Sequence, residues 1–287
     1  MESKLNILKQ EWAELHQNPE HQKIRIKDAA DMLNVSEAEL LSTTIGENSY
    51  FLNIQNWEEF FNKISLLGSM MYLVRNDYAV HENNIHINHI CIDSNNIVLS
   101  NSCSRITIDQ TLIEYTFYTS TIIRGDEIYS IHLFDKNGIA IIKIYLKNDN
   151  LNDFKAIKNK YKINYNFELQ LFKKTNPNIQ KLKKQNTKKI LMKPISDNNF
   201  SIQKHLEALA EKKQKIQIKV SNKAATSVYK GTIKNVIHKF GWLNIMDPTF
   251  NLHLQDKKIN KIFRGENHKN TIFFYHNEQY ILNILNL

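Results

Sequence analysis

The chain has 287 residues, a hydrophobic content of 42% and a formal net charge of +9 at pH 7. This length provides ample material for one or two packed cores. The stretch MESKLNILKQEW carries acidic residues and no continuous apolar run, and no segment is long and apolar enough to cross a bilayer, so we expect a cytoplasmic protein without membrane insertion. Two cysteines, Cys91 and Cys103, exclude a disulfide framework and predict reduced, structural thiols.

The positive charge is concentrated in one segment. Lys173 to Lys193 holds eight lysines and no acidic residue, which leaves a net charge of +1 for the rest of the chain. Like charges at this density predict a solvated tether, and the alternative is a strip that binds phosphates or carboxylates. We therefore expect a first domain over residues 1–172, a Lys-rich linker over 173–194 and a second domain over 195–287.

The N-terminal part of the chain has the spacing of short amphipathic helices. Apolar residues at helical spacing predict a first helix that ends at Pro19 and a second helix near residues 27–33. Ser36 and Glu39 form the capping box of a third helix. A further apolar stripe over Trp57–Leu67 predicts a fourth helix.

The second and third helices have the rhythm of a helix-turn-helix DNA-binding motif. A helix that reads the major groove presents hydrogen-bond donors and positive charge to the DNA. The segment SEAELLSTT instead carries Glu37 and Glu39 and contains no Arg or Lys. We therefore expect no nucleic-acid partner.

After Gly68 the hydrophobic pattern changes from helical to alternating, which is typical of antiparallel strands. The turn signal DKNG between SIHLF and IAIIKIYL predicts a hairpin, and an amphipathic helix follows near residues 152–161. The predicted strands are MMYLVRNDYAVH, with a turn at NDYA, and NNIVLS, SRITI, EYTFYTSTII, EIYSIHLFD and AIIKIYLK.

Beyond the Lys-rich segment the same order of elements returns in shortened form. IQKHLEALAEK aligns with IQNWEEFFNK, IKVSNKAATSV with YLVRNDYAV, and TIFFYHNEQYILNIL with SIHLFDKNGIAIIKIYL. This pattern indicates an internal duplication. The sequence thus predicts an α+β fold of two tandem repeats, each an antiparallel β-sheet packed with helices.

Several of these strings resemble a known family. VSEAEL, LGSMMYLVRNDYAVHE, SIHLFDKNGIAIIKIYL and GWLNIMDPTFNLHL, in this order, are similar to the haem-utilisation and haemin-degrading proteins of the HemS/ChuS/PhuS (HemS/ChuX) type. The resemblance implies a cytoplasmic bacterial protein for haem trafficking and iron acquisition, with haem held between its two repeats. It also implies that haem is passed to a haem oxygenase, exchanged with a haem transporter, or degraded with an electron donor.

Haem requires an apolar surface, cations for its propionates and, in most proteins, a side-chain ligand for its iron. In the family the axial histidine lies on a helix that opens the second repeat, in a segment like VHQFF. No such segment exists here, and His205 is the histidine on a helix near the start of the second repeat. His205 is therefore the candidate iron ligand, and a solvent-facing structural histidine is the alternative.

The resemblance implies further haem-binding candidates. Arg105 is the nearest match to a family arginine that faces haem, and Lys239 lies one place before the position of a family basic residue, which is Phe240 here. His268 corresponds to a family tyrosine. Two strand histidines, His81 and His253, match family histidines directly.

Two alternatives come from a different class of function. HENNIHINHIC places His81, His86, His89 and Cys91 close together, which suggests a small transition-metal-binding protein. His81 and His86 are not four residues apart, so they do not match a zincin helix. The second alternative is a degenerate HemS-like scaffold that binds a protein partner without haem.

Because the chain contains no GxGxxG, GxxxxGK[ST] or GxSxG, we expect neither a nucleotide cradle nor a nucleophile elbow.

Overall fold

The computed structural model describes residues 4–21, 24–123, 125–163, 192–195, 200–266 and 270–287. The chain divides into two compact units. Unit 1 comprises the ranges 1–67 and 110–181, and unit 2 comprises 68–109 and 182–287. Within the described ranges no helix is long and apolar enough to span a membrane.

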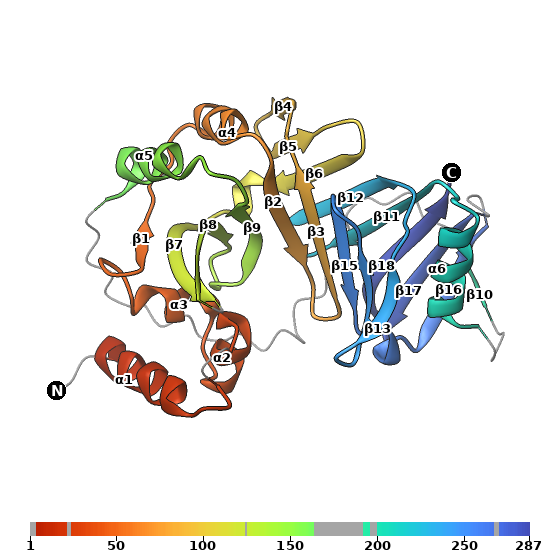
Figure 1. Ribbon diagram of the computed structural model, residues 1–287, viewed down its shortest axis with the longest axis horizontal. Coiled ribbons are helices and arrows are strands. Elements are labelled where there is room, and N and C mark those ends of the chain that lie inside the picture. The colour runs from red at the N-terminus through yellow and green to blue at the C-terminus, as the bar shows by residue number, and fades with distance from the viewer. Residues whose placement is uncertain (1–3, 22–23, 124, 164–191, 196–199, 267–269) are drawn as a thin grey trace. The chain divides into compact units, whose positions relative to one another are not determined.

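The helices of unit 1 pack on each other near the N-terminus. A shared apolar cluster centred on Leu8, Ala29 and Leu40 joins the first three helices, which lie together in the red part of Figure 1. Ser36 and Glu39 form the predicted capping box at the start of the third helix. The helices are α1 (Lys4–Gln17), α2 (Ile26–Met32), α3 (Glu37–Ser42), α4 (Trp57–Leu66) and α5 (Leu151–Tyr161), with a 3-10 turn at Gln110–Leu112.

Unit 1 also contains antiparallel strands, each hydrogen-bonded to the next in the order β1-β7-β8-β9. Leu41 of α3 packs with Phe117 and Phe134 on one face of these strands. On the other face, the rings of Tyr118 and Phe154 lie 5.3 Å apart and join the strands to α5. The strands are β1 (Ser49–Phe51), β7 (Tyr115–Ile123), β8 (Asp126–Phe134) and β9 (Ala140–Leu146), and the β8–β9 turn confirms the predicted DKNG hairpin.

Unit 2 is built from two groups of antiparallel strands and helix α6 (Ile202–Glu211). The first group runs in the order β2-β3-β15-β14-β13, with bounds β2 (Met70–Arg75), β3 (Ala79–Ile85), β15 (Phe250–Leu254), β14 (Trp242–Met246) and β13 (Val236–Lys239). The second is a nine-stranded sheet in the order β10-β16-β17-β18-β11-β12-β6-β5-β4. Its strands are β10 (Met192–Pro194), β16 (Lys261–Gly265), β17 (Thr271–His276), β18 (Gln279–Asn286), β11 (Ile216–Ser221), β12 (Ala225–Gly231), β6 (Ser104–Asp109), β5 (Asn96–Ser100) and β4 (His89–Ile92).

The core of unit 2 lies between these two sheets. Leu252 of β15 and Ile218 of β11 belong to one buried cluster, which α6 joins through Leu206. Each strand therefore has one face toward this cluster and one face away from it, because side chains alternate along a strand.

The duplication is visible as a constant offset within unit 2. His81 and Ser227 lie 146 residues apart, and the same offset relates β2 to β11 and β3 to β12. β3 pairs with β15, whereas β12 pairs with β6. The β2–β3 hairpin of the first repeat is thus joined to strands β15, β14 and β13 of the second, and the β11–β12 hairpin of the second repeat to β6, β5 and β4 of the first. This arrangement confirms the α+β fold with two tandem repeats.

Sequence patterns did not predict the short strands β1, β4, β10, β13 and β16. Four of these are edge strands and the fifth, β16, lies beside one, where a strand of few residues shows little alternation. Residues 173–191 of the Lys-rich linker lie outside the described residues. Its last three residues form β10, which pairs with β16.

Candidate functional site

One row of side chains crosses the face of the nine-stranded sheet that points away from the core. The register places Arg105 opposite Ser100 on one side and opposite Val228 on the other. Val228 in turn lies opposite Lys219. We call this surface the Arg105 face, and its row runs His89, Ser100, Arg105, Val228, Lys219, Asn283, Phe273, Phe263 and Pro194.

The cations of this row are separated by an apolar residue. Arg105 is exposed and Lys219 is half-buried, with the partly buried Val228 between them. Neighbouring strands lie roughly 4.8 Å apart, so Arg105 and Lys219 are about 10 Å from each other at the backbone. Burial lowers the pKa of Lys219. A carboxylate bound here would favour the charged form of this lysine and gain a partner in the Arg105 guanidinium.

Aromatic side chains occupy the other end of the row. The rings of Phe263 and Tyr275 meet edge-to-face with centroids 5.5 Å apart, and those of Tyr275 and Tyr280 are 5.7 Å apart. The hydroxyl of Tyr280 donates to the main-chain oxygen of Lys219 at 3.1 Å. This hydrogen bond ties the aromatic group to the strand that carries one of the two cations.

His205 lies on the opposite side of this sheet from Arg105. It sits on α6, whose Leu206 and Leu209 belong to the core cluster. Its ring is 5.7 Å from that of Phe200, and its Nε2 atom is buried without a hydrogen-bond partner among the described residues. Burial, together with the charge of Arg264, lowers the pKa of His205. A single porphyrin therefore cannot contact both His205 and Arg105 in this arrangement.

His81 is part of a buried polar cluster at the centre of unit 2. Its Nδ1 atom is 2.7 Å from Ser227 Oγ, and Asn83 Nδ2 donates to the same oxygen at 2.9 Å. Ser104 Oγ donates to Asn83 Oδ1 at 3.0 Å. His81 is 0% exposed, and burial lowers its pKa to about 3. It is a neutral core histidine here, and a ligand could reach it only by displacing core side chains.

His253 and Lys239 lie on the other sheet of unit 2. The amide nitrogen of Asn244 donates to the main-chain oxygen of Trp242, which fixes the orientation of the amide. Asn244 Oδ1 therefore accepts a hydrogen bond from His253 Nδ1 at 2.6 Å. Its Nε2 is 3.9 Å from a carboxylate oxygen of Glu82. Lys239 is exposed, with Nζ 4.9 Å from the ring centroid of Phe240. Neither residue joins the Arg105 face, and His268 lies outside the described residues.

The histidines of HENNIHINHIC are not brought together. His81 is buried, whereas His86 and His89 are exposed. Across the described ranges, no three His, Cys, Asp or Glu side chains converge in a way that could hold a metal ion. The structure therefore gives no support to the transition-metal site proposed from this segment. Cys91 and Cys103 are free and exposed, and neither forms a disulfide.

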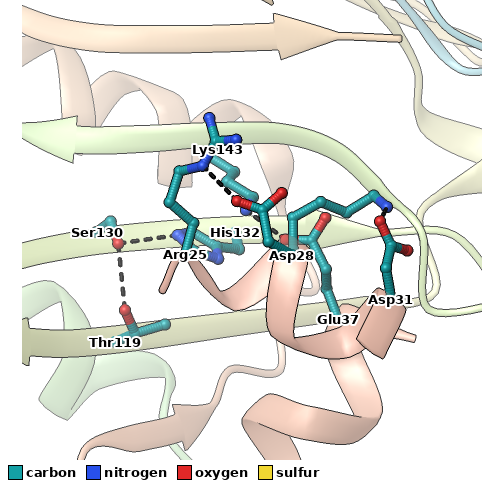
Figure 2. A network of polar contacts seen from close by, with 9 residues as sticks. Arg25, Asp28, Asp31, Glu37, Thr119, Ser130, His132 and Lys143 are labelled. Atoms are coloured by element: carbon teal, nitrogen blue, oxygen red, sulfur yellow. Dashed lines mark hydrogen bonds and ion pairs between the residues drawn. The ribbon is translucent and has the colours of Figure 1, made fainter. Parts of the chain in front are cut away.

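A separate polar network lies inside unit 1 (Figure 2). Lys143 of β9 and Glu37 of α3 form an ion pair whose side chains are only 6% and 4% exposed. On β8, Ser130 Oγ lies 2.9 Å from His132 Nε2 and 3.2 Å from Thr119 Oγ1 of β7. The ion pair fixes α3 on the strands. Because all six residues of α3 are buried, this helix has no free face for a DNA groove.

The sequence nominated Arg105 as a haem-binding candidate but did not group it with the other members of its row. The alternation in IQIKVS places Lys219 on the non-core side of β11, which was a usable signal. The position of His89 in the same row depends on how β4 pairs, and no local pattern specifies that pairing.

Two curated proteins are similar to this chain. The hemin transport protein HmuS of Yersinia pestis is 24% identical over 278 residues, covering 84% of this chain and 79% of HmuS. The hemin transport protein HemS of Yersinia enterocolitica is 23% identical over 273 residues, covering 81% of this chain and 77% of HemS.

Solved structures share the fold. ChuS from Escherichia coli O157:H7, described as a heme degrading enzyme, has a TM-score of 0.84 at 19% identity, covering 99% of this chain and 93% of ChuS. Holo-PhuS from Pseudomonas aeruginosa, described as a heme-binding protein, has the same score, identity and coverage. The family model described as the haemin-degrading HemS.ChuX domain matches residues 34–161 and 195–272, one segment in each repeat. The chain therefore belongs to the HemS/ChuX family.

Proposed function

We propose that the protein binds haem and carries it within the cytoplasm for haem utilisation and iron acquisition. Membership of the HemS/ChuX family supports this function, as do two relatives that are named hemin transport proteins. The partners that fit a carrier are a haem transporter that supplies haem and a haem oxygenase that receives it.

The observation that carries the proposal is the composition of the Arg105 face. Haem has a flat apolar ring and two propionate carboxylates at one edge. Arg105 and Lys219 provide cations on either side of the apolar Val228, and Phe273 and Phe263 continue the row. A guanidinium can bind a carboxylate with two parallel hydrogen bonds, which makes Arg105 the principal propionate partner in this proposal.

Degradation of haem is the second candidate function. The matched family model is described as haemin-degrading, and ChuS is described as a heme degrading enzyme. Opening of the haem ring consumes oxygen and electrons, so an enzyme of this class needs an electron donor. In this proposal haem is the substrate, and the Arg105 face fixes its orientation through the propionates.

Titration with haemin tests the proposal. Purified protein should shift the Soret band of haemin saturably at low micromolar concentration, and Arg105→Ala should weaken binding by about tenfold, the equivalent of one charge-assisted hydrogen-bond pair. Arg25→Ala is the matched control, because Arg25 is an exposed arginine on α2's N-terminal side that pairs with Asp28 in unit 1. His205→Ala should bind as the wild type does, since His205 lies on the opposite side of the sheet.

A spectrum identical to that of free haemin would contradict haem binding and favour the protein-binding scaffold. If haemin binds, addition of a reductant and oxygen separates the two functions. Loss of the Soret band indicates degradation, whereas a stable band indicates a carrier.

A further inference from the structure

Strand β4 brings a histidine into the row of the Arg105 face. His89 lies opposite Ser100, and Ser100 lies opposite Arg105 on the next strand. Paired residues of antiparallel strands point to the same face of a sheet. Burial agrees with this register, because His89 and Arg105 are exposed while Leu99 and Ile106 on the other face are buried.

The spacing of His89 and Arg105 suits a single haem. Two strand spacings separate them, roughly 10 Å at the backbone. The iron of a haem and its propionate carboxylates are separated by a comparable span. One haem whose iron lies over β4 can therefore reach Arg105 with a propionate.

The side chains between and beside these residues are small or aliphatic. Ser100 is small, and Val98 lies opposite Cys91 on the same face with only 8% of its surface exposed. A histidine that stands perpendicular to a sheet orients a ligated ring parallel to the sheet. Ser100 and Val98 lie on the face that such a ring would cover.

We propose that His89 supplies the nitrogen ligand to haem iron on the Arg105 face. This inference rests on the proposed haem binding and assigns its iron ligand. Imidazole is the commonest side-chain ligand of haem iron. Of the other candidate haem ligands that the structure describes, His205 lies on the other side of the sheet, His81 is buried, and His253 lies on the other sheet of unit 2.

Cys91 is the competing donor. It is an exposed free thiol on the same strand and on the same face as His89. A thiolate and an imidazole give different electronic spectra on ferric haem, so the two assignments can be separated by experiment.

The decisive experiment uses protein labelled with ¹⁵N in histidine and loaded with haemin. Pulsed electron paramagnetic resonance of the ferric complex should show coupling to a ¹⁵N nucleus, which the porphyrin nitrogens cannot supply. His89→Ala should lose this coupling and bind haemin at least tenfold more weakly. Added imidazole should restore the wild-type Soret spectrum, because it can occupy the vacated iron position.

His86→Ala is the matched control, since His86 is an exposed histidine three residues earlier in the chain that does not belong to the row. It should keep both the coupling and the affinity. A His89→Ala protein with wild-type coupling would overturn the assignment while leaving haem binding intact, and so would a thiolate spectrum that disappears in Cys91→Ser. Absence of haemin binding by the wild type would overturn both this assignment and the proposed function.

Discussion

His81 and Ser227 occupy equivalent positions in the two repeats, 146 residues apart, and their side chains hydrogen-bond to each other with Nδ1 and Oγ 2.7 Å apart. The same offset relates Asn83 to Tyr229 and Ser104 to Phe250. In the first repeat Ser104 and Asn83 form a hydrogen bond, in which Ser104 Oγ donates to Asn83 Oδ1 at 3.0 Å. The second repeat stacks the rings of Tyr229 and Phe250 with centroids 4.1 Å apart. The residues on either side of the His81–Ser227 hydrogen bond therefore differ in chemistry between the two repeats.

The buried His81 predicts a stability that falls in mild acid. Its pKa is lowered to about 3 by burial, from an ordinary value of 6.5. Between these values the unfolded chain binds a proton at His81 that the folded chain excludes. The contribution of neutral His81 to stability is therefore fully present above pH 6.5 and is lost as the pH decreases toward 3. The slope is up to about 1.4 kcal/mol per pH unit. Urea denaturation at a series of pH values measures it.

Two variants separate His81 from other titrating groups. His81→Asn should reduce this pH slope even if it lowers stability overall. The exposed control His86→Ala should retain the slope. Equal slopes in the wild type and in His81→Asn would show that another group controls the acid response.

Asn76 and Asn222 form a second pair at the same offset, and we predict that both stabilise unit 2. Asn76 Nδ2 donates to the main-chain oxygens of Ser221 and Ile281 at 3.1 and 2.8 Å. Asn222 Nδ2 donates to the main-chain oxygen of Arg75 at 3.2 Å. Because each amide bridges two hairpins, Asn76→Ala should cost about 2–3 kcal/mol of unfolding free energy, measured by urea denaturation.

Asn95→Ala is the control for this prediction. Asn95 lies in the exposed β4–β5 turn, and its main-chain nitrogen, which the substitution retains, donates to Asp93. Its replacement should change stability by less than about 0.5 kcal/mol. A comparable loss in Asn95→Ala and Asn76→Ala would mean that the bridges between hairpins add nothing.

Local patterns were sufficient for the helices and for most strands. The capping box of Ser36 and Glu39, the helix over Trp57–Leu66 and the DKNG hairpin are all encoded by residues close together in sequence, and all three are confirmed. The two-repeat architecture is confirmed as well, since it compares one local pattern with another. The predicted alignment of the helices is displaced, because it pairs Ile54 with Ile202 whereas the helix N-caps are Asn56 and Ser201.

Pairing between repeats was not predictable from these patterns. β6 pairs with β12 and β3 with β15, at separations of more than a hundred residues. The face of each site residue depends on such pairings. Arg105 and His205 were therefore placed in one candidate site although the sheet lies between them, and His89 was considered with His81 and His86 rather than with Arg105.

The ion pair of Glu37 and Lys143 predicts opposite effects of single and double replacement. Both side chains are buried, so Glu37→Gln removes the carboxylate that pairs with the buried ammonium group of Lys143. This should cost about 3–5 kcal/mol of unfolding free energy. The double variant Glu37→Leu/Lys143→Met removes both charges and should recover most of that loss. A double-mutant cycle by thermal denaturation measures the coupling, and additive losses would contradict it.

Gly138 predicts a steric contact between the β8–β9 turn and α3. Its φ is +70°, and an added Cβ would lie 2.2 Å from Ser36 Oγ and 2.7 Å from Ser36 Cβ. Gly46 has a φ of +88° and no atom within 4 Å of such a Cβ. Gly46→Ala should therefore show backbone strain alone, about 1–2 kcal/mol, and Gly138→Ala a larger loss. Equal losses in urea denaturation would exclude the steric contribution.

The exchange of strands between repeats bears on the origin of the linker. Because β3 is completed by β15 and β12 by β6, each repeat leaves one hydrogen-bonding edge of its own hairpin to be paired by the other repeat. A half-length polypeptide carrying one repeat would expose an open sheet edge and would have to associate with a second copy to cover it. The segment between the repeats therefore supplies a covalent connection where two separate half-length chains would need a subunit interface. The fusion also freed the two copies to differ, so that Arg105 on one side corresponds to Asn251 on the other.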